Sequence, residues 1–137
     1  MIPRGIRNHN PGNLRWKATR RKWVGQAGQD QDGFCIFLDP LYGLRAMAKL
    51  LLNYHRRQGL DCVADIITGY APPTENPTDV YIATVANSLG VDPYDPLPLD
   101  EPKTVHRLME AIIRVECGVQ PYKSELIDEA LGLAWKP

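Results

Sequence analysis

The chain has little of what marks disulfide-bonded, metal-binding or membrane-spanning proteins. It holds three cysteines among 137 residues, widely spaced and without a CxxC pair, so we expect neither a disulfide framework nor a zinc site. The three histidines have no metal-ligand spacing. No apolar run approaches the ~18 residues that a membrane span needs, and the first residues lack the apolar segment of a secretory signal. These absences predict a protein made in the cytoplasm without a signal peptide, and with no metal, cofactor or membrane partner.

Common catalytic signatures are absent as well. The sequence contains no GxSxG, no HExxH and no glycine-rich phosphate loop. No histidine is placed to form a thiolate pair with Cys117. These absences argue against a serine or cysteine nucleophile, a zinc protease and a nucleotide-binding site. If the protein is an enzyme, its carboxylates are the groups to consider.

The positive charge of the chain is concentrated at its N-terminal end. The formal net charge is zero, with 16 basic and 16 acidic residues. Residues 1–22 nevertheless hold seven Lys or Arg and no acid. Such a segment can attract nucleic acid, a membrane or an acidic polymer. It lacks the interleaved aromatic side chains of a single-strand stacking platform, which argues against nucleic acid as the partner.

Hydrophobic periodicity predicts a mainly α-helical chain that forms one domain over residues 1–137. Asp39 and Pro40 are typical of a helix start, and Gly59 of a helix end. A short helix capped by Asp61 should end at Gly69. We expect irregular structure with a small hairpin over 15–38, and no helix over the proline-rich segments 70–78 and 91–102. The predicted helices span about 40–58, 61–69, 78–89, 103–117 and 123–134.

The segment from residue 4 to residue 16, RGIRNHNPGNLRW, is the most densely polar part of the chain. It contains three Asn and three Arg and shows no helical or strand period. Asn, Gly and Pro favour turns, but amide and guanidinium groups also offer many directional hydrogen-bond donors. Asn8, Asn10, Asn13 and Arg15 are therefore candidate ligand-binding residues. The alternative is an ordered loop whose amides satisfy the chain's own backbone.

Glu116 has an unusual position for a surface carboxylate. The helix predicted over 103–117 carries an apolar stripe, and Glu116 continues this stripe because it follows Ile112 by four residues. It also falls in the last turn, where the helix dipole disfavours negative charge. Both effects favour a protonated carboxyl, which is what a general acid for glycoside cleavage requires. The alternative is a side chain that turns out to solvent or meets Arg15 or Arg114.

Other carboxylates compete for a role in the site. Glu75 lies beside Asn76 in the loop APPTENPTD, where it is a candidate second acid or base, or a group at the start of the next helix. Asn76 is a candidate substrate-binding side chain. Asp30 and Asp32, in GQDQDG, are expected to be solvated. Asp79 is expected in the first turn of its helix, where the dipole favours it.

Five blocks of the sequence together resemble a family of phage and prophage virion proteins, whose members are often labelled only as structural proteins. The blocks follow one another from about residue 4 to about residue 131. They are RGIRNHNPGNLRW, then WVG, then FCIFLDPLYGLRAMAKLLLNY, then APPTENPTDVYIATVANSLGV, and finally AIIRVECGVQPY.

A more distant resemblance suggests a chemistry. NPGNLRW, WVG and the segment from Phe34 to Tyr54 are similar, in the same order, to parts of the flagellar and autolysin type of bacterial N-acetylglucosaminidase, which has a lysozyme-like helical fold. In that family a catalytic helix ending Glu-Ser-Gly precedes these parts. Here a helix ending Glu116-Cys117-Gly118 follows them, which looks like a circular permutation. Cys117 stands where that family has Ser, and Tyr70 stands where the phage proteins often have Trp.

The resemblance implies a lysozyme-like peptidoglycan hydrolase, lytic transglycosylase or glucosaminidase with Glu116 as general acid and base. It implies that the four candidate residues of the N-terminal loop bind sugar substituents and that Trp23, Tyr81 and Tyr122 stack on sugar faces. The partners would be peptidoglycan and phage virion or effector-delivery proteins, and the protein would act in the virion or in the target-cell periplasm and wall. Two other classes stay open, a non-catalytic virion structural or wall-binding module and a nucleic-acid-binding helical domain.

Overall fold

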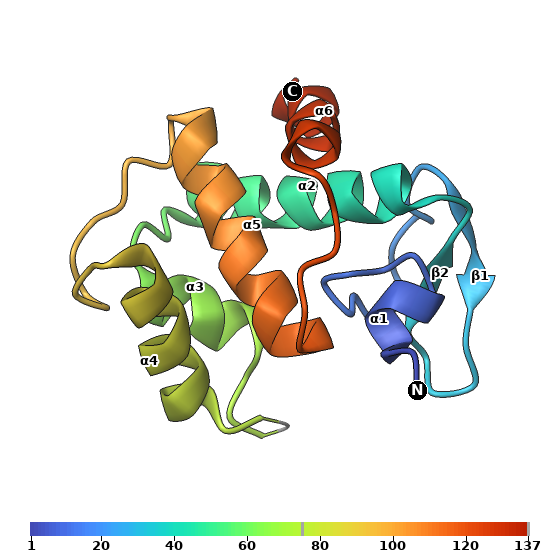
Figure 1. Cartoon of the computed structure of the whole chain (residues 1–137), viewed down its shortest axis with the longest axis horizontal. Coiled ribbons are helices and arrows are strands. Elements are labelled where there is room, and N and C mark those ends of the chain that lie inside the picture. The colour runs from blue at the N-terminus through green and yellow to red at the C-terminus, as the bar shows by residue number, and fades with distance from the viewer. Residues whose placement is uncertain (75, 137) are drawn as a thin grey trace.

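The computed structural model describes residues 1–74 and 76–136, and this part of the chain is mainly helical (Figure 1). A short two-stranded antiparallel sheet lies near the N-terminus, between the first helix and the long second helix. In chain order the elements are α1 (Arg4–Arg7), β1 (Gln26–Gln29), β2 (Cys35–Phe37), α2 (Pro40–Gln58), α3 (Val63–Tyr70), α4 (Thr78–Leu89), α5 (Pro102–Cys117) and α6 (Ser124–Trp135).

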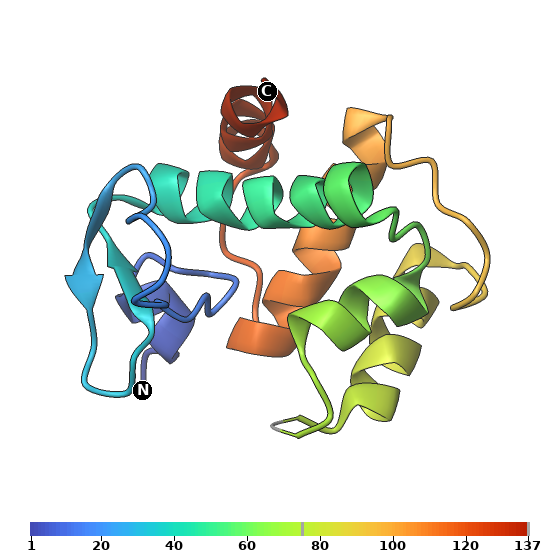
Figure 2. The same ribbon diagram turned by 180° about the vertical axis from the view of Figure 1, so that it is seen from behind.

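The long helix α2 spans much of the width of the molecule, and α3, α5 and α6 pack against it (Figures 1 and 2). Its start and end are those that the sequence predicts. The Asp39 side chain accepts a hydrogen bond from the Leu41 N–H at 2.9 Å, with Pro40 in the first turn. Gly59 ends the helix with a φ of 69°, a left-handed conformation that suits glycine.

The core lies where α2, α5 and α6 meet. Leu44, Met47, Leu108, Ile112 and Ile127 are fully buried there. Helix α6 crosses α2 on one side, while α3 and α4 pack together on another side of the α2–α5 pair (Figure 1). Because α5 is apolar along the face that it buries, its last turn is carried into the interior of the molecule. Glu116 lies in that turn.

The hairpin predicted over 15–38 is confirmed and ties the N-terminal loop to the rest of the fold. Strands β1 and β2 pair antiparallel, with Gln29 opposite Cys35. The free edge of β2 binds the N-terminal loop, because the Cys35 N–H donates to the Leu14 carbonyl and the Phe37 N–H to the Asn8 carbonyl, both at 2.9 Å. The loop is therefore fixed by the sheet rather than free in solvent.

All five predicted helices agree with the structure to within two residues at each end, and three local expectations need correction. Residues 4–7 form α1, a single turn too short to leave a periodic signal. Tyr70, expected outside any helix, is the last residue of α3. The N-cap of α3 is Cys62, without a side-chain capping bond, instead of Asp61.

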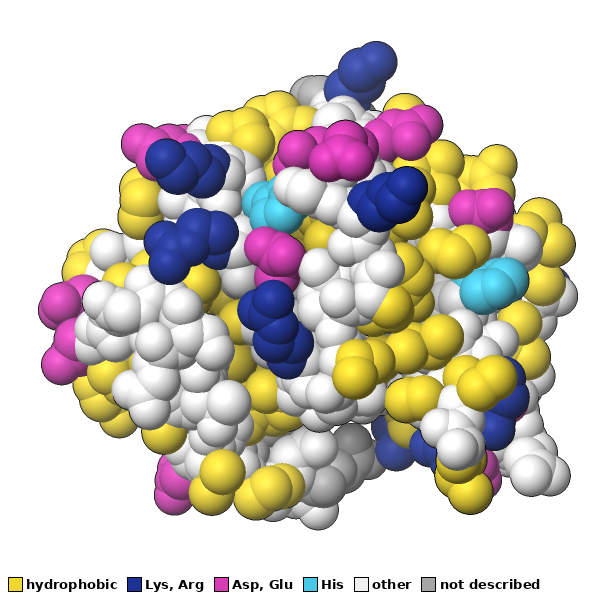
Figure 3. All heavy atoms as spheres, in the orientation of Figure 1, with side chains coloured by type: hydrophobic (Ala, Val, Ile, Leu, Met, Phe, Trp, Pro, Cys, Tyr) yellow, Lys and Arg dark blue, Asp and Glu magenta, His cyan; other side chains and the backbone are white. Residues whose placement is uncertain are grey.

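No helix in the described ranges has both the length and the apolar character that crossing a bilayer requires. On the face drawn in Figure 3, basic and acidic side chains are interspersed with hydrophobic ones. This face therefore carries no extended patch of one sign.

Candidate functional site

The last turn of α5 meets the asparagine-rich loop, although the two are about a hundred residues apart in sequence. The Asn13 amide Nδ2 donates to Glu116 Oε1 at 2.9 Å, and it lies 3.4 Å from the Glu116 backbone carbonyl. The Cys117 thiol donates to the Pro11 carbonyl at 3.4 Å. Asn13 has a φ of +50°, in the left-handed region that Asn tolerates better than most residues. The turn thus aims the Asn13 amide at the carboxylate.

Helix α4 supplies the second partner of Glu116. The Tyr81 hydroxyl donates to Glu116 Oε2 at 2.7 Å, and the Tyr81 side chain is buried. Burial, and after it the neighbouring Tyr70 and Glu116, raise the pKa of Tyr81 far above its ordinary value. The hydroxyl therefore remains a donor over any pH at which the protein is used. Each carboxylate oxygen of Glu116 is held by a different element, and the residue itself is half-buried.

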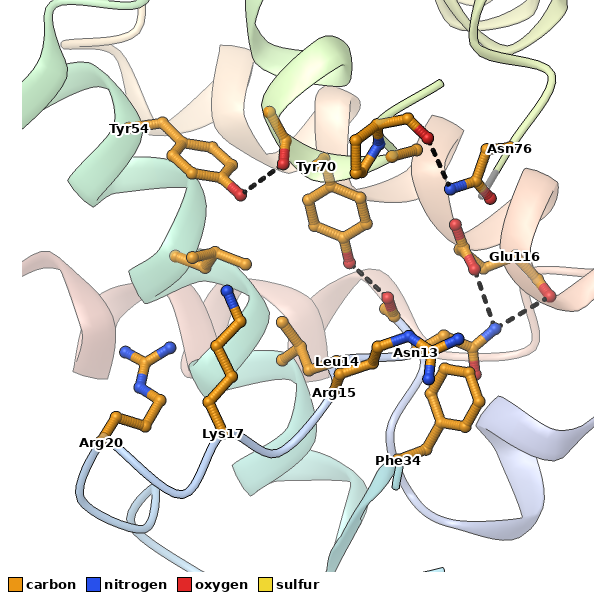
Figure 4. A pocket seen from close by; sticks show the side chains of 15 residues that line it. Asn13, Leu14, Arg15, Lys17, Arg20, Phe34, Tyr54, Tyr70, Asn76 and Glu116 are labelled. Atoms are coloured by element: carbon orange, nitrogen blue, oxygen red, sulfur yellow. Dashed lines mark hydrogen bonds between the residues drawn. The ribbon is translucent and has the colours of Figure 1, made fainter. Parts of the chain in front are cut away.

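Glu116 lies at a cavity of about 270 Å³ between the N-terminal loop, α2 and the end of α3 (Figure 4). The wall includes Asn13, Arg15 and Asn76, which the sequence singles out, together with residues that it does not. The described residues that line it are Gly12, Asn13, Leu14, Arg15, Lys17, Arg20, Phe34, Leu50, Tyr54, Gly69, Tyr70, Ala71, Pro72, Asn76 and Glu116. Among these described residues Glu116 is the one carboxylate, and in Figure 4 Lys17 and Arg20 lie well apart from it.

Arg15 is held on this wall by an aromatic stack. Its guanidinium lies 4.3 Å from the centre of the Phe34 ring, and Arg4 covers the same ring at 4.4 Å. Arg4 is in turn paired with Asp32, at 2.8 Å between Nη2 and Oδ2. Two cations that share one ring at this distance gain from the ring's quadrupole. Asp32, expected to be solvated, is thus half of an exposed ion pair.

Two tyrosines form the part of the wall that faces the loop. The Tyr70 hydroxyl donates to the Gly12 carbonyl, and the Tyr54 hydroxyl donates to the Gly69 carbonyl at 3.1 Å. A Cβ on Gly12 would overlap the Tyr70 hydroxyl oxygen, so the loop can approach α3 only with glycine there. Burial first, and then the charge of Glu116, raise the pKa of Tyr70 well above its ordinary value.

Asn8 and Asn10 do not line the cavity. Asn10 is completely buried: its Nδ2 donates to the Leu14 and Cys35 carbonyls, and its Oδ1 accepts from the Leu14 N–H. Asn8 is also buried and donates to Asp30 Oδ2 at 3.0 Å. These two residues are therefore structural rather than ligand-binding, because their amides form hydrogen bonds with groups of the chain itself.

Asp30 is a structural carboxylate, which corrects the expectation that it is simply solvated. It accepts hydrogen bonds from the Asn8 amide and from the backbone N–H groups of Asp32 and Phe34. Burial acts to raise its pKa, but these donors and the nearby Arg4 outweigh it, and the pKa of Asp30 is lowered. The side chain organises the turn between β1 and β2.

Trp23, Tyr81 and Tyr122, for which the resemblance implies stacking on sugar faces, are all absent from the described lining of the cavity. Trp23 is outside the cavity lining and lies under Arg20, whose guanidinium is 4.0 Å from the indole centre. Tyr122 is half-buried outside the cavity, and burial raises its pKa to about 12. Tyr81 is buried and outside the described lining of the cavity, and it contacts Glu116 through its hydroxyl.

The loop after α3 completes the site. Asn76 lines the cavity and donates to the Pro72 carbonyl at 3.3 Å, while Glu75 lies outside the described residues. Asp79 falls in the first turn of α4, as expected. No group of three or more His, Cys, Asp or Glu side chains in residues 1–74 and 76–136 is arranged to hold a metal ion.

Local sequence patterns point to part of this site only. Leu50 and Tyr54 could be found as an i, i+4 pair on one face of α2. Lys17 and Arg20 belong to the basic N-terminal segment, but no pattern distinguishes them from the other cations in it. Nothing in the sequence pairs Tyr81 with Glu116.

The comparisons with known proteins give a family for the chain. No protein-family model matches it. The chain is 36% identical over 134 residues to Protein P5 of Pseudoalteromonas phage PM2, an alignment that covers 96% of the chain and 81% of that phage protein. Identity at this level over nearly the whole chain indicates common descent and a shared fold. The chain therefore belongs to the family of the phage PM2 Protein P5.

Proposed function

We propose that this protein cleaves the glycan strands of bacterial peptidoglycan, with Glu116 as general acid and base. The observation that carries the proposal is the placement of one carboxylate, oriented by Asn13 and Tyr81, at the end of a cavity walled by amide, hydroxyl and cationic groups. Amides and hydroxyls suit the N-acetyl and hydroxyl groups of an amino sugar. The cations suit the carboxylates of the muramic acid substituents.

The chemistry needs a single carboxyl group. Protonated Glu116 transfers its proton to the glycosidic oxygen, and the bond between that oxygen and the anomeric carbon breaks to leave an oxocarbenium-like centre. The Glu116 carboxylate then removes a proton from a water molecule, or from a hydroxyl of the same sugar, as that oxygen attacks the anomeric carbon. The first route gives a reducing sugar and the second an anhydro sugar. Neither route requires a second acid, which fits the described lining of the cavity.

The position of α5 supports a lysozyme-like arrangement reached by circular permutation. In the N-acetylglucosaminidases that the sequence resembles, the glutamate helix leads directly into the Asn-Leu loop. Here the chain does not connect them, yet Glu116 and Asn13 are in hydrogen-bond contact. This contact is what a circular permutation of that arrangement would produce, and it supports the proposal.

A non-catalytic virion or wall-binding module is the second candidate. It is favoured by the family itself, since the relative is a phage protein. It also accounts for Glu116 as a structural carboxylate, because the residue ties α5 to α4 and to the N-terminal loop through two hydrogen bonds. As a module of a virion, the protein would bind the wall at the site of DNA delivery. As an enzyme, it would open the wall there or act as a delivered antibacterial effector.

Clearing of purified peptidoglycan separates the two candidates. We expect the parent protein to clear a suspension and Glu116→Gln to lose this activity, because the amide cannot donate an acidic proton. Glu129→Gln, on the exposed face of α6, is the matched control and should clear like the parent. If Glu116→Gln clears as fast as the control, Glu116 is not the acid. If none of the three proteins clears while all bind, the module is the correct function.

A further inference from the structure

A second cavity lies on the face of α2 next to Leu50 and Tyr54, and its described lining is strongly cationic. It measures about 330 Å³ and is formed where the C-terminal half of α2 meets the end of α6. Its lining residues are Lys49, Asn53, Arg56, Arg57 and Trp135. Three cations and one amide line it, and none of these residues is acidic.

Two of the three cations have a structural partner. Lys49 Nζ donates to the Lys136 carbonyl at 2.7 Å, and the Arg56 guanidinium donates to the Trp135 carbonyl at 3.1 Å. Both therefore satisfy carbonyl groups at the C-terminal end of α6, where positive charge is favourable. Arg56 also stacks over the Trp135 ring at 5.0 Å.

The cations exceed what this capping role needs. Arg57 is exposed and makes no hydrogen bond or ion pair with the residues that the structure describes. Burial first, and then the charges of Arg45, Arg56 and Arg57, lower the pKa of Lys49. Cations that repel one another around a cavity whose described lining holds no carboxylate gain from an anionic ligand.

The two cavities are adjacent along the surface of α2. Leu50 and Tyr54 line the cavity of Glu116, while Asn53 and Arg57 line the second one. Residues three and four apart on a helix are surface neighbours, so Asn53 and Arg57 flank Leu50 and Tyr54 directly. An extended ligand that passed from the first cavity over Tyr54 would come next to Asn53 and Arg57 of the second one.

We infer that the cavity between α2 and α6 is a second subsite, which binds the stem-peptide carboxylates of a glycan strand whose sugars occupy the cavity of Glu116. This inference rests on the proposed function. A carboxylate-bearing glycan strand fits better than a nucleic acid, because its sugars suit the amide and hydroxyl groups that line the first cavity. Trp135 adds an aromatic edge for the apolar part of a peptide.

Binding measurements test this subsite without depending on turnover. Arg57→Gln removes the cation without a structural partner and leaves the capping contacts of α6 in place. Arg114→Gln, which lines neither cavity, is the matched control. Each is made in the Glu116→Gln background, and affinity is measured for soluble glycan oligomers that keep their stem peptides, for neutral N-acetylglucosamine oligomers of matched length, and for a short DNA duplex.

We expect Arg57→Gln to weaken binding of the stem-bearing oligomers about three-fold, the effect of one exposed charge pair, and more at low salt. Binding of the neutral oligomers should not change, and Arg114→Gln should match the parent with all probes. Equal affinity of Arg57→Gln and parent for the stem-bearing oligomers would overturn the subsite. Preferential DNA binding that Arg57→Gln removes would overturn the assignment of the ligand. Failure of the catalytic proposal is seen separately, either as cleavage of peptidoglycan by Glu116→Gln or as no cleavage by the parent protein.

Discussion

Asn10 provides the sharpest test of how the N-terminal loop is held. Its side chain is fully buried and makes three hydrogen bonds, two as donor to the carbonyls of Leu14 and Cys35 and one as acceptor from the Leu14 N–H, at 2.9–3.0 Å. Asn10→Ala removes all three. The Leu14 carbonyl keeps its bond from the Cys35 N–H, but the Leu14 N–H is left buried and unpaired.

The magnitude follows from these contacts. A typical hydrogen bond contributes about 0.5–1.5 kcal/mol, and a buried donor left unpaired costs about 1–3 kcal/mol. We therefore expect Asn10→Ala to lower the free energy of unfolding by about 3 kcal/mol. For a domain of this size that corresponds to a drop in Tm of roughly 10 °C.

Denaturant titration and thermal unfolding both measure this loss. Asn87→Ala, an exposed asparagine on α4, is the matched control and should unfold like the parent. An Asn10→Ala protein that unfolds within about 0.5 kcal/mol of the parent would refute the structural role. In that case loss of glycan binding by the same variant would return Asn10 to the list of ligand-binding residues.

Three further predictions concern other contacts. Tyr81→Phe removes the hydrogen-bond donor to Glu116 Oε2, so we expect kcat on peptidoglycan to fall about ten-fold with little change in KM. An unchanged kcat would show that this hydrogen bond does not position the carboxyl group. Gly43→Ala places a Cβ on the His9 carbonyl oxygen, so calorimetry should show that the free energy of unfolding falls by about 3 kcal/mol. A fall of less than about 1 kcal/mol would mean that the N-terminal loop moves away from α2 at little cost. The pKa of Asp30 is lowered in the folded state, so its stabilising effect is present at neutral pH and is lost as the pH falls through that lowered pKa. Acid unfolding of Asp30→Asn should therefore depend less steeply on pH than that of the parent, and equal slopes would contradict this contribution.

The helices could be predicted because their ends carry local signals. Asp39 with Pro40 marks the start of α2 and Gly59 its end, and Gly59 adopts the left-handed conformation. The apolar stripe of α5 also placed Glu116 toward the interior. These features depend on residues within a few positions of one another, which is the range over which a sequence pattern can be interpreted.

The composition of the site could not be predicted in the same way, because it depends on contacts between distant segments. Asn10 and Asn13 are the same residue type in the same loop, yet one is buried against β2 and the other is turned toward Glu116. Their difference comes from the docking of the loop on the strand and on α5. Likewise Tyr81 occupies an apolar position of α4, and only the packing of α4 on α5 makes its hydroxyl a partner of Glu116.

Mass spectrometry of the fragments released from purified peptidoglycan tests the central claim most directly. We expect the parent protein and Glu129→Gln to release glycan fragments of one type, either reducing or anhydro, and the folded Glu116→Gln protein to release none. Release of the same fragments by Glu116→Gln would contradict the role of this carboxyl as the acid. Absence of fragments from the parent protein, folded and bound to the wall, would contradict catalysis itself.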